Sequence, residues 1–97
     1  MKAIEFHPGA QVDYDESLDW YASRSAPAAR KFAEAVDKSL RRIQRNPEQF
    51  RAVDALHREC TLQRFPFRII FRATNEQIVV VAVVHAKRRP RYWRDRK

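Results

Sequence analysis

The sequence predicts one α+β domain over residues 1–97, in which an antiparallel helical hairpin packs on a mainly antiparallel sheet in the order β-α-α-β-β-β. Three observations support this fold class. Apolar residues recur every three or four positions between residues 10 and 46, as in amphipathic helices. Beyond Pro47 they alternate with polar residues, as in strands. The chain of 97 residues contains only one glycine and five prolines, which suits a compact domain better than a disordered segment.

The first two predicted elements are a short strand and an amphipathic helix. Residues 2–7 alternate in polarity and end at Pro8-Gly9, which predicts a strand followed by a break. From about residue 10 to residue 24 the spacing of apolar residues is helical. One apolar stripe is formed by Tyr14, Leu18, Tyr21 and Ala22. Near the helix N-terminus, where the helix dipole favours negative charge, we expect a solvated acidic cluster of Asp13, Asp15, Glu16 and Asp19.

A second helix is predicted to follow after a short turn. Pro27 suits its first turn, and Asn46-Pro47 ends it. Its apolar stripe consists of Ala29, Phe32, Val36, Leu40 and Ile43. Because the connection is short, the two helices should form an antiparallel hairpin. The cations near the end of the helix suit the negative pole of its dipole, and we prefer this reading to a ligand site: Lys38, Arg41, Arg42 and Arg45.

Three strands are predicted in the second half of the chain, over residues 57–65, 67–73 and 77–85. The last two are joined by a turn at residues 74–76, where Asn75 tolerates the left-handed conformation of a hairpin. Residues 78–84 are apolar on both faces, so this strand should be central and covered by the helices on at least one side.

Positive charge is concentrated toward the C-terminus. The formal net charge is +8, yet residues 1–50 hold eight basic and eight acidic side chains. Residues 51–84 hold five basic and three acidic residues, and residues 85–97 hold seven basic residues and one acid. We therefore expect a basic C-terminal tail over residues 86–97 that binds an anionic partner. The alternative is a tail that serves only solubility.

Several classes of function find no support in the sequence. A single cysteine, Cys60, cannot form an intramolecular disulfide, and the N-terminal residues lack the apolar core of a signal peptide. The apolar run at 78–84 is too short to span a bilayer, so we expect a cytoplasmic protein without membrane contact. One glycine leaves no phosphate-binding loop, and the histidines lack zinc-ligand spacing. We expect no metal and no cofactor.

The remaining candidates for chemistry are basic and aromatic residues. Arg68 and Arg72 should project from one face of a strand, and four cations follow the last strand: Lys87, Arg88, Arg89 and Arg91. If these groups converge, they could hold a phosphodiester, and His85 or Tyr92 could move protons without a metal. The alternatives are a structural His85 and a Tyr92-Trp93 pair that anchors the tail on the core.

The order and spacing of several segments resemble the RelE/ParE superfamily of bacterial toxins across nearly the whole chain. The segments are residues 62–72, 78–85 and 88–93, with His7-Pro8, Trp20-Tyr21 and Asn46-Pro47 upstream. The resemblance implies a helical hairpin on an antiparallel sheet. It also implies the toxin of a type II toxin-antitoxin module, associated with growth inhibition and plasmid stabilisation. A cognate antitoxin would neutralise it with an acidic or amphipathic C-terminal segment.

The superfamily divides into two functional groups, and the residues favour the ParE-like group. RelE-like members are metal-independent, ribosome-dependent endoribonucleases that cut messenger RNA. Arg68, Arg88 and Tyr92 match their catalytic positions, with His85 as a weaker candidate. However, Glu59 and Thr61 stand where two sheet lysines are typical, and an acid there would repel the scissile phosphate. ParE-like members inhibit DNA gyrase by binding. We therefore expect a non-enzymatic gyrase inhibitor, with the ribonuclease as the alternative.

The predicted contact surface for a target or an antitoxin combines the basic residues with three aromatic residues. It consists of Arg68, Arg72, Lys87, Arg88, Arg89, Arg91, Tyr92, Trp93 and Trp20. An amphipathic antitoxin segment could dock beside the helical hairpin or add a strand to the sheet edge. A homodimer or a toxin-antitoxin hetero-oligomer is compatible with the sequence. A third reading is a basic nucleic-acid-binding domain without toxicity.

Overall fold

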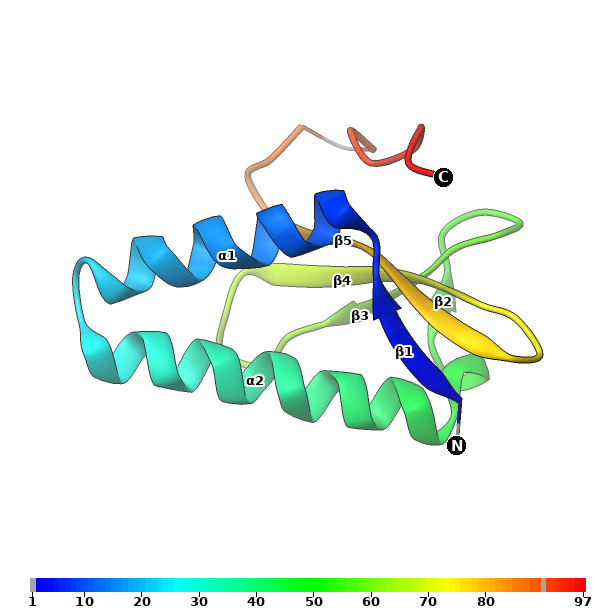
Figure 1. The fold of residues 1–97 in the computed structure, drawn as a ribbon, viewed down its shortest axis with the longest axis horizontal. Helices are drawn as coiled ribbons and strands as arrows, with labels where there is room; N and C mark the ends of the chain where they lie inside the picture. The colour runs from blue at the N-terminus through cyan, green and yellow to red at the C-terminus, as the bar shows by residue number, and fades with distance from the viewer. Residues whose placement is uncertain (1, 90) are drawn as a thin grey trace.

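The computed structural model describes residues 2–89 and 91–97 and has two helices packed on one five-stranded sheet (Figure 1). The elements follow the chain as β1 (Ala3–Phe6), α1 (Pro8–Ala22), α2 (Ala26–Arg45), the 3₁₀ turn η1 (Pro47–Gln49), β2 (Arg51–Ala52), β3 (Arg58–Thr61), β4 (Phe67–Ala73) and β5 (Gln77–His85). The strand order is β1-β5-β4-β3-β2. β1 pairs in parallel with β5, and the other neighbours are antiparallel.

The α+β prediction is confirmed, with differences at the ends of elements. The last two strands have the predicted bounds. α1 begins at Pro8 rather than near residue 10, because the His7 ring caps it: its Nδ1 accepts a hydrogen bond of 2.9 Å from the Gly9 amide. The strand expected over 57–65 is confined to Arg58–Thr61. β2 was not predicted, since a two-residue strand carries no periodicity.

The first core lies between the helices and one face of the sheet. α2 contributes Phe32, Val36 and Ile43, each at most 1% exposed, as its apolar stripe predicts. The α1 side chains Tyr14 and Tyr21 pack on Phe32, with ring centroids 5.8 Å and 5.2 Å from it. Phe32 in turn lies 5.0 Å from Phe67 at the start of β4. This aromatic cluster fixes the distance between the hairpin and the sheet.

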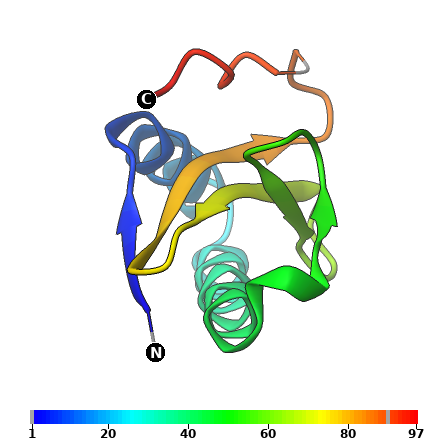
Figure 2. The same cartoon turned by 90° about the vertical axis from the view of Figure 1, so that its right-hand side faces the viewer.

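A second core lies on the other side of the sheet and is closed by the C-terminal residues. Residues 91–97, here named the C-terminal strap, pass over β5 on the side away from α2 (Figure 2). Trp93 is 1% exposed and packs against Ile70, Val81, Ala82 and Val84. The predicted basic tail is therefore corrected in part: its last seven residues fold back on the sheet. The alternative reading, in which Tyr92-Trp93 anchors the tail, describes the structure.

The loop between β2 and β3 supports the second core through His57. The His57 ring lies 4.9 Å from the Trp93 ring and is held by Asp54, whose Oδ1 is 2.9 Å from His57 Nδ1. Backbone amides of Leu56 and His57 also donate to this carboxylate. Burial raises the pKa of Asp54, but these hydrogen bonds outweigh it and lower the pKa to about 2.

Candidate functional site

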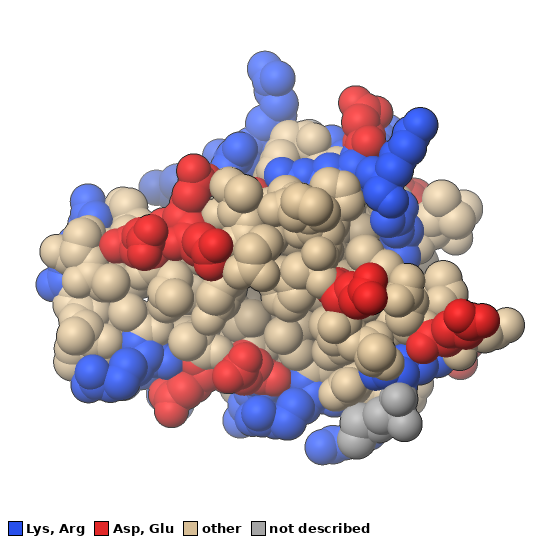
Figure 3. Space-filling model, in the orientation of Figure 1, with Lys and Arg blue, Asp and Glu red and all other residues tan. Residues whose placement is uncertain are grey.

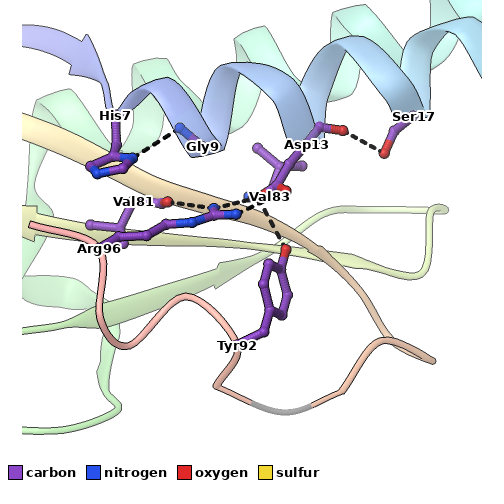
Figure 4. Close-up of polar contacts among 8 residues, drawn as sticks. All are labelled: His7, Gly9, Asp13, Ser17, Val81, Val83, Tyr92 and Arg96. Carbon is purple, nitrogen blue, oxygen red and sulfur yellow. Dashed lines mark hydrogen bonds and ion pairs between the residues drawn. The ribbon is translucent and has the colours of Figure 1, made fainter.

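Asp13 on α1 fastens the C-terminal strap to the body of the protein (Figure 4). Its Oδ2 accepts hydrogen bonds from Arg96 Nη1 at 2.8 Å, from the Tyr92 hydroxyl at 3.0 Å and from the Val83 amide at 3.1 Å. Arg96 Nη1 also donates to the Val81 carbonyl at 3.0 Å. The prediction that Asp13 belongs to a solvated acidic cluster is wrong. The residue is 5% exposed, because α1 turns it toward β5 and the strap.

Two further residues shape this attachment. A Cβ atom on Gly9 would lie 2.5 Å from Arg96 Nε, so with any other residue the guanidinium would have to shift from its place beside α1. Arg72 on β4 donates to the Lys97 carbonyl at 3.1 Å. Arg72, predicted as a surface contact, thus holds the end of the strap.

A groove of about 620 Å³ lies between α1 and the adjoining ends of β4 and β5. Its apolar walls are formed by Trp20, Tyr21, Pro66, Phe67 and Val83. One margin is acidic, with Asp13 and Glu16, and the other carries His85, Lys87 and Arg88. Trp20 is 53% exposed, and the Arg24 guanidinium stacks 3.8 Å from its ring centroid. Large apolar walls with charges of both signs at the margins suit a protein segment as ligand.

A smaller hollow of about 150 Å³ lies over β3 and β4 and contains Arg68. Arg51, Val53, Glu59, Arg91 and Trp93 complete its lining. The Glu59 carboxylate accepts from Arg68 Nη1 at 2.7 Å and lies 3.3 Å from Arg51 Nη1. The positive charge of Arg68 is therefore already compensated by an acid on the neighbouring strand.

The condition for phosphodiester binding was convergence of the basic residues, and the structure does not bring them together on one concave face. Arg68 and Arg91 line the small hollow, whereas Trp20, His85, Lys87 and Arg88 line the groove. Arg89 is exposed outside both. Trp93 is buried in the second core, which removes it from the predicted contact surface. The sheet itself separates the two sets, because the strap carries Arg91 onto the face opposite the helices.

The two candidates for proton transfer are held in structural contacts. Burial raises the pKa of the Tyr92 phenol, and the charge of Asp13 and its hydrogen bond with the phenol raise the pKa further. The cations of Arg88 and Arg96 lower the pKa in part, which leaves it at about 12. His85 Nδ1 accepts from the Lys87 amide at 3.0 Å, and its ring packs edge-on against Phe67 at 4.9 Å. In residues 2–89 and 91–97, no group of histidine, cysteine and carboxylate side chains is arranged to hold a metal ion.

Sequence reasoning missed Asp13 and Arg96, which organise the strap. Nothing in the local sequence separates Asp13 from its acidic neighbours on α1. One signal did exist. The chain has a single glycine, Gly9, and glycine permits close approach of another group to the backbone. The partner of that approach, Arg96, could not be read from the sequence.

The fold and the sequence both match proteins of known type. The sequence model of the family described as ParE toxin of type II toxin-antitoxin system, parDE, matches residues 4–90. The chain belongs to the ParE toxin family. The ParE-like prediction is thereby confirmed over the RelE-like alternative, and membership of such a module implies a cognate antitoxin.

Individual relatives agree with this assignment. A toxin ParE2 from Mycobacterium tuberculosis is 27% identical over 90 residues, which cover 92% of this chain and 86% of the relative. The solved structure titled chromosomal ParDE TA system from P. aeruginosa superposes with a TM-score of 0.75 at 22% identity. The match covers 90% of this ParE-family chain and 98% of that one, which supports the fold. Among the described residues of the toxin, neither helix has the length and apolar composition needed to cross a membrane.

Proposed function

We propose that this ParE-family toxin arrests growth by binding DNA gyrase in the cytoplasm, without catalysing a reaction, and that its antitoxin silences it from the groove beside α1. One observation supports inhibition by binding rather than by RNA cleavage. Two of the groups that a ribonuclease would use, Arg68 and Tyr92, each contact a carboxylate: Glu59 and Asp13, respectively.

Both contacts oppose RNA cleavage for electrostatic reasons. A scissile phosphate placed beside Arg68 would also lie beside the Glu59 carboxylate, which repels it. Tyr92 would have to lose a proton to act as a base, and its pKa of about 12 keeps it protonated at neutral pH. Binding to a protein needs neither free phosphate-binding cations nor a titrating group, so the same arrangement is compatible with inhibition by contact.

The groove offers the features expected of an antitoxin site. Trp20 and Tyr21 supply aromatic anchors, and aromatic residues dominate the binding energy of protein interfaces. Lys87 and Arg88 at one margin would pair with an acidic antitoxin segment, while the apolar walls would accept the apolar face of an amphipathic helix. The expected assembly is a toxin-antitoxin hetero-oligomer.

The target is tested with purified toxin in a gyrase supercoiling assay, run beside an assay of cleavage of translated messenger RNA. We expect supercoiling to be inhibited, messages to stay intact, and Tyr92→Phe to inhibit as strongly as the unaltered toxin. Codon-positioned cleavage that Arg68→Ala abolishes would instead establish the ribonuclease.

The antitoxin site is tested by measuring antitoxin affinity for Trp20→Ala and for Leu56→Ala as a matched control. Leu56 is 70% exposed on the β2–β3 loop, away from the groove. Removing an aromatic anchor should weaken binding by about tenfold or more, the usual effect of losing an interface hot spot. Equal affinities for the two variants would place the antitoxin elsewhere.

A further inference from the structure

The outer face of α2 is basic toward its C-terminus, and no acid lies between residues 38 and 45. Figure 3 shows Lys and Arg groups along the lower rim of the molecule, over α2, with Asp or Glu groups between some of them. Between residues 38 and 45 the helix has four cations: Lys38, Arg41, Arg42 and Arg45. Lys38, Arg41 and Arg45 are exposed and lie at helical spacing on one face. These three residues are named the α2 stripe.

The α2 stripe has no intramolecular explanation that covers all its members. Within residues 2–89 and 91–97, the ion pairs lie elsewhere, at Glu59, Asp54 and Asp13. The helix dipole favours cations only in the last turn, where Arg42 and Arg45 lie. Lys38 and Arg41 precede that turn. Glu34 and Asp37 lie one turn before Lys38 and Arg41, but the ion pairs of the described residues include neither acid. The C-terminal end of α2 therefore keeps a net positive charge, and this favours an anionic ligand.

A polar hollow continues the α2 stripe beyond the end of the helix. It has a volume of about 380 Å³, and Arg45 belongs to both features. Lys2 and Arg58 are the other cations of its lining, and the polar side chains are Asn46, Thr74 and Asn75, with one acid, Glu48. Arg58 is held in place, because its Nη1 donates to the Phe50 carbonyl at 2.7 Å. Positive charge thus extends from a helix face into a concave surface.

We propose that the α2 stripe and this hollow bind the phosphodiester backbone of double-stranded DNA. Along a helix, seven residues span about 10 Å, which is close to the axial rise of three phosphates on one DNA strand. Lysine and arginine are the residues that contact phosphates, and such contacts need no apolar anchor.

The composition of the surface favours DNA over an acidic protein. Stable protein interfaces contain large apolar or aromatic side chains at their centre. Among the described residues, the exposed large hydrophobic side chains are Val12, Trp20 and Leu56, and none lies on α2. The groove beside α1 has such anchors, and the α2 stripe has only charges and polar groups. The two surfaces share no residue, so the toxin could hold DNA while a protein occupies the groove.

The test measures binding of the full-length toxin to a short labelled DNA duplex by fluorescence anisotropy at several salt concentrations. One variant combines Lys38→Gln, Arg41→Gln and Arg45→Gln. The matched control combines Arg89→Gln, Arg94→Gln and Lys97→Gln, which are exposed cations outside the stripe. Both variants remove three charges from the formal net charge of +8, so a general charge effect weakens them equally.

The α2 variant should bind about tenfold or more weakly and lose roughly two to three units of the slope of log affinity against log salt, since each phosphate contact contributes about 0.9. The control should stay within about threefold of the unaltered toxin. Equal weakening of both variants, or no binding by the unaltered toxin at low salt, overturns the proposal. Competition by polyglutamate as strong as that by DNA also overturns it, in favour of an acidic protein. Trp20→Ala should leave DNA binding unchanged, which separates this site from the groove.

Discussion

Replacing Asp13 by alanine should cost about 3 kcal/mol of the free energy of unfolding, because this side chain joins the C-terminal strap to α1 and β5. The Asp13 side chain is 4% exposed and accepts from Arg96, Tyr92 and Val83. Breaking a buried ion pair by removing one partner costs about 3–5 kcal/mol, and a buried unsatisfied donor costs about 1–3 kcal/mol. These costs overlap. The Arg96 side chain is 19% exposed and can regain water, so the lower end of the range applies.

A loss of this size is large for a small domain. Total stabilities are about 5–15 kcal/mol, and each kcal/mol lowers the melting temperature of such a domain by about 4–8 °C. The measurement is denaturant unfolding followed by circular dichroism and tryptophan fluorescence. Asp19→Ala is the matched control, since it removes the same charge from an exposed position on the same helix. It should change stability by no more than about 0.5 kcal/mol.

A double-mutant cycle with Arg96→Ala separates the contact from general effects of either substitution. Arg96 Nη1 donates to Asp13 Oδ2 at 2.8 Å. The double variant should therefore lose about 1 kcal/mol or more less of the free energy of unfolding than the sum of the losses of the two single variants. Strictly additive losses, or a loss below about 1 kcal/mol for Asp13→Ala, would refute the view that Asp13 fastens the strap.

Three further outcomes follow from the structure. Gly9→Ala should destabilise the toxin by about 1–2 kcal/mol in denaturant unfolding, because a Cβ would lie 2.5 Å from Arg96 Nε. The loss should disappear when Arg96 is also replaced by alanine. A loss that persists in the double variant would show that the steric conflict is not with Arg96. Trp93→Ala should cost about 3–5 kcal/mol of the free energy of unfolding, since Trp93 is 1% exposed. Leu56→Ala is the control and should be nearly neutral, because Leu56 is exposed. A small loss for Trp93→Ala would mean that Trp93 does not close the second core. The pKa of Asp54 is lowered from 3.8 to about 2, so its contribution to the free energy of unfolding is present above pH 4 and is lost as the pH falls toward 2. When unfolding is measured at several pH values in this range, the free energy of unfolding should decrease less with falling pH for Asp54→Asn than for the unaltered toxin. The same decrease in both would contradict the hydrogen-bonded carboxylate.

The parts of the fold that the sequence predicted best are those whose signal is local. The apolar run of β5 and the turn before it identified the strand at Gln77–His85. The apolar stripe of α2, with Pro27 in the first turn and Asn46-Pro47 at the end, identified the helix at Ala26–Arg45. The structure adds a cap, because Ser25 Oγ accepts from the Ala28 amide at 3.2 Å. β2 has only two residues and depends on pairing with β3, so no periodicity could predict it.

The candidate site was harder to predict, because tertiary contacts decide which charges are free. Glu59 was recognised as unsuited to a phosphate, and the structure shows it paired with Arg68. The register supplies the reason: Arg68 lies opposite Thr61, two residues from Glu59 on the same face of β3. The arginines do not converge on one face, since the chain folds its last residues onto the side of the sheet opposite the helices. No pattern in residues 86–97 indicates that fold-back except the Tyr92-Trp93 pair.

The attachment of the strap also bears on how long the folded toxin persists. The ion pair between Asp13 and Arg96 joins residues 83 positions apart in the sequence, whereas the contacts within the α1–α2 pair and the β4–β5 hairpin join residues that are near in the sequence. Local contacts tend to form early in folding, so the strap should dock after the transition state. Substitutions that loosen it would then act mainly by raising the rate of unfolding. In that case Asp13 determines the lifetime of the native toxin more than the speed with which it folds.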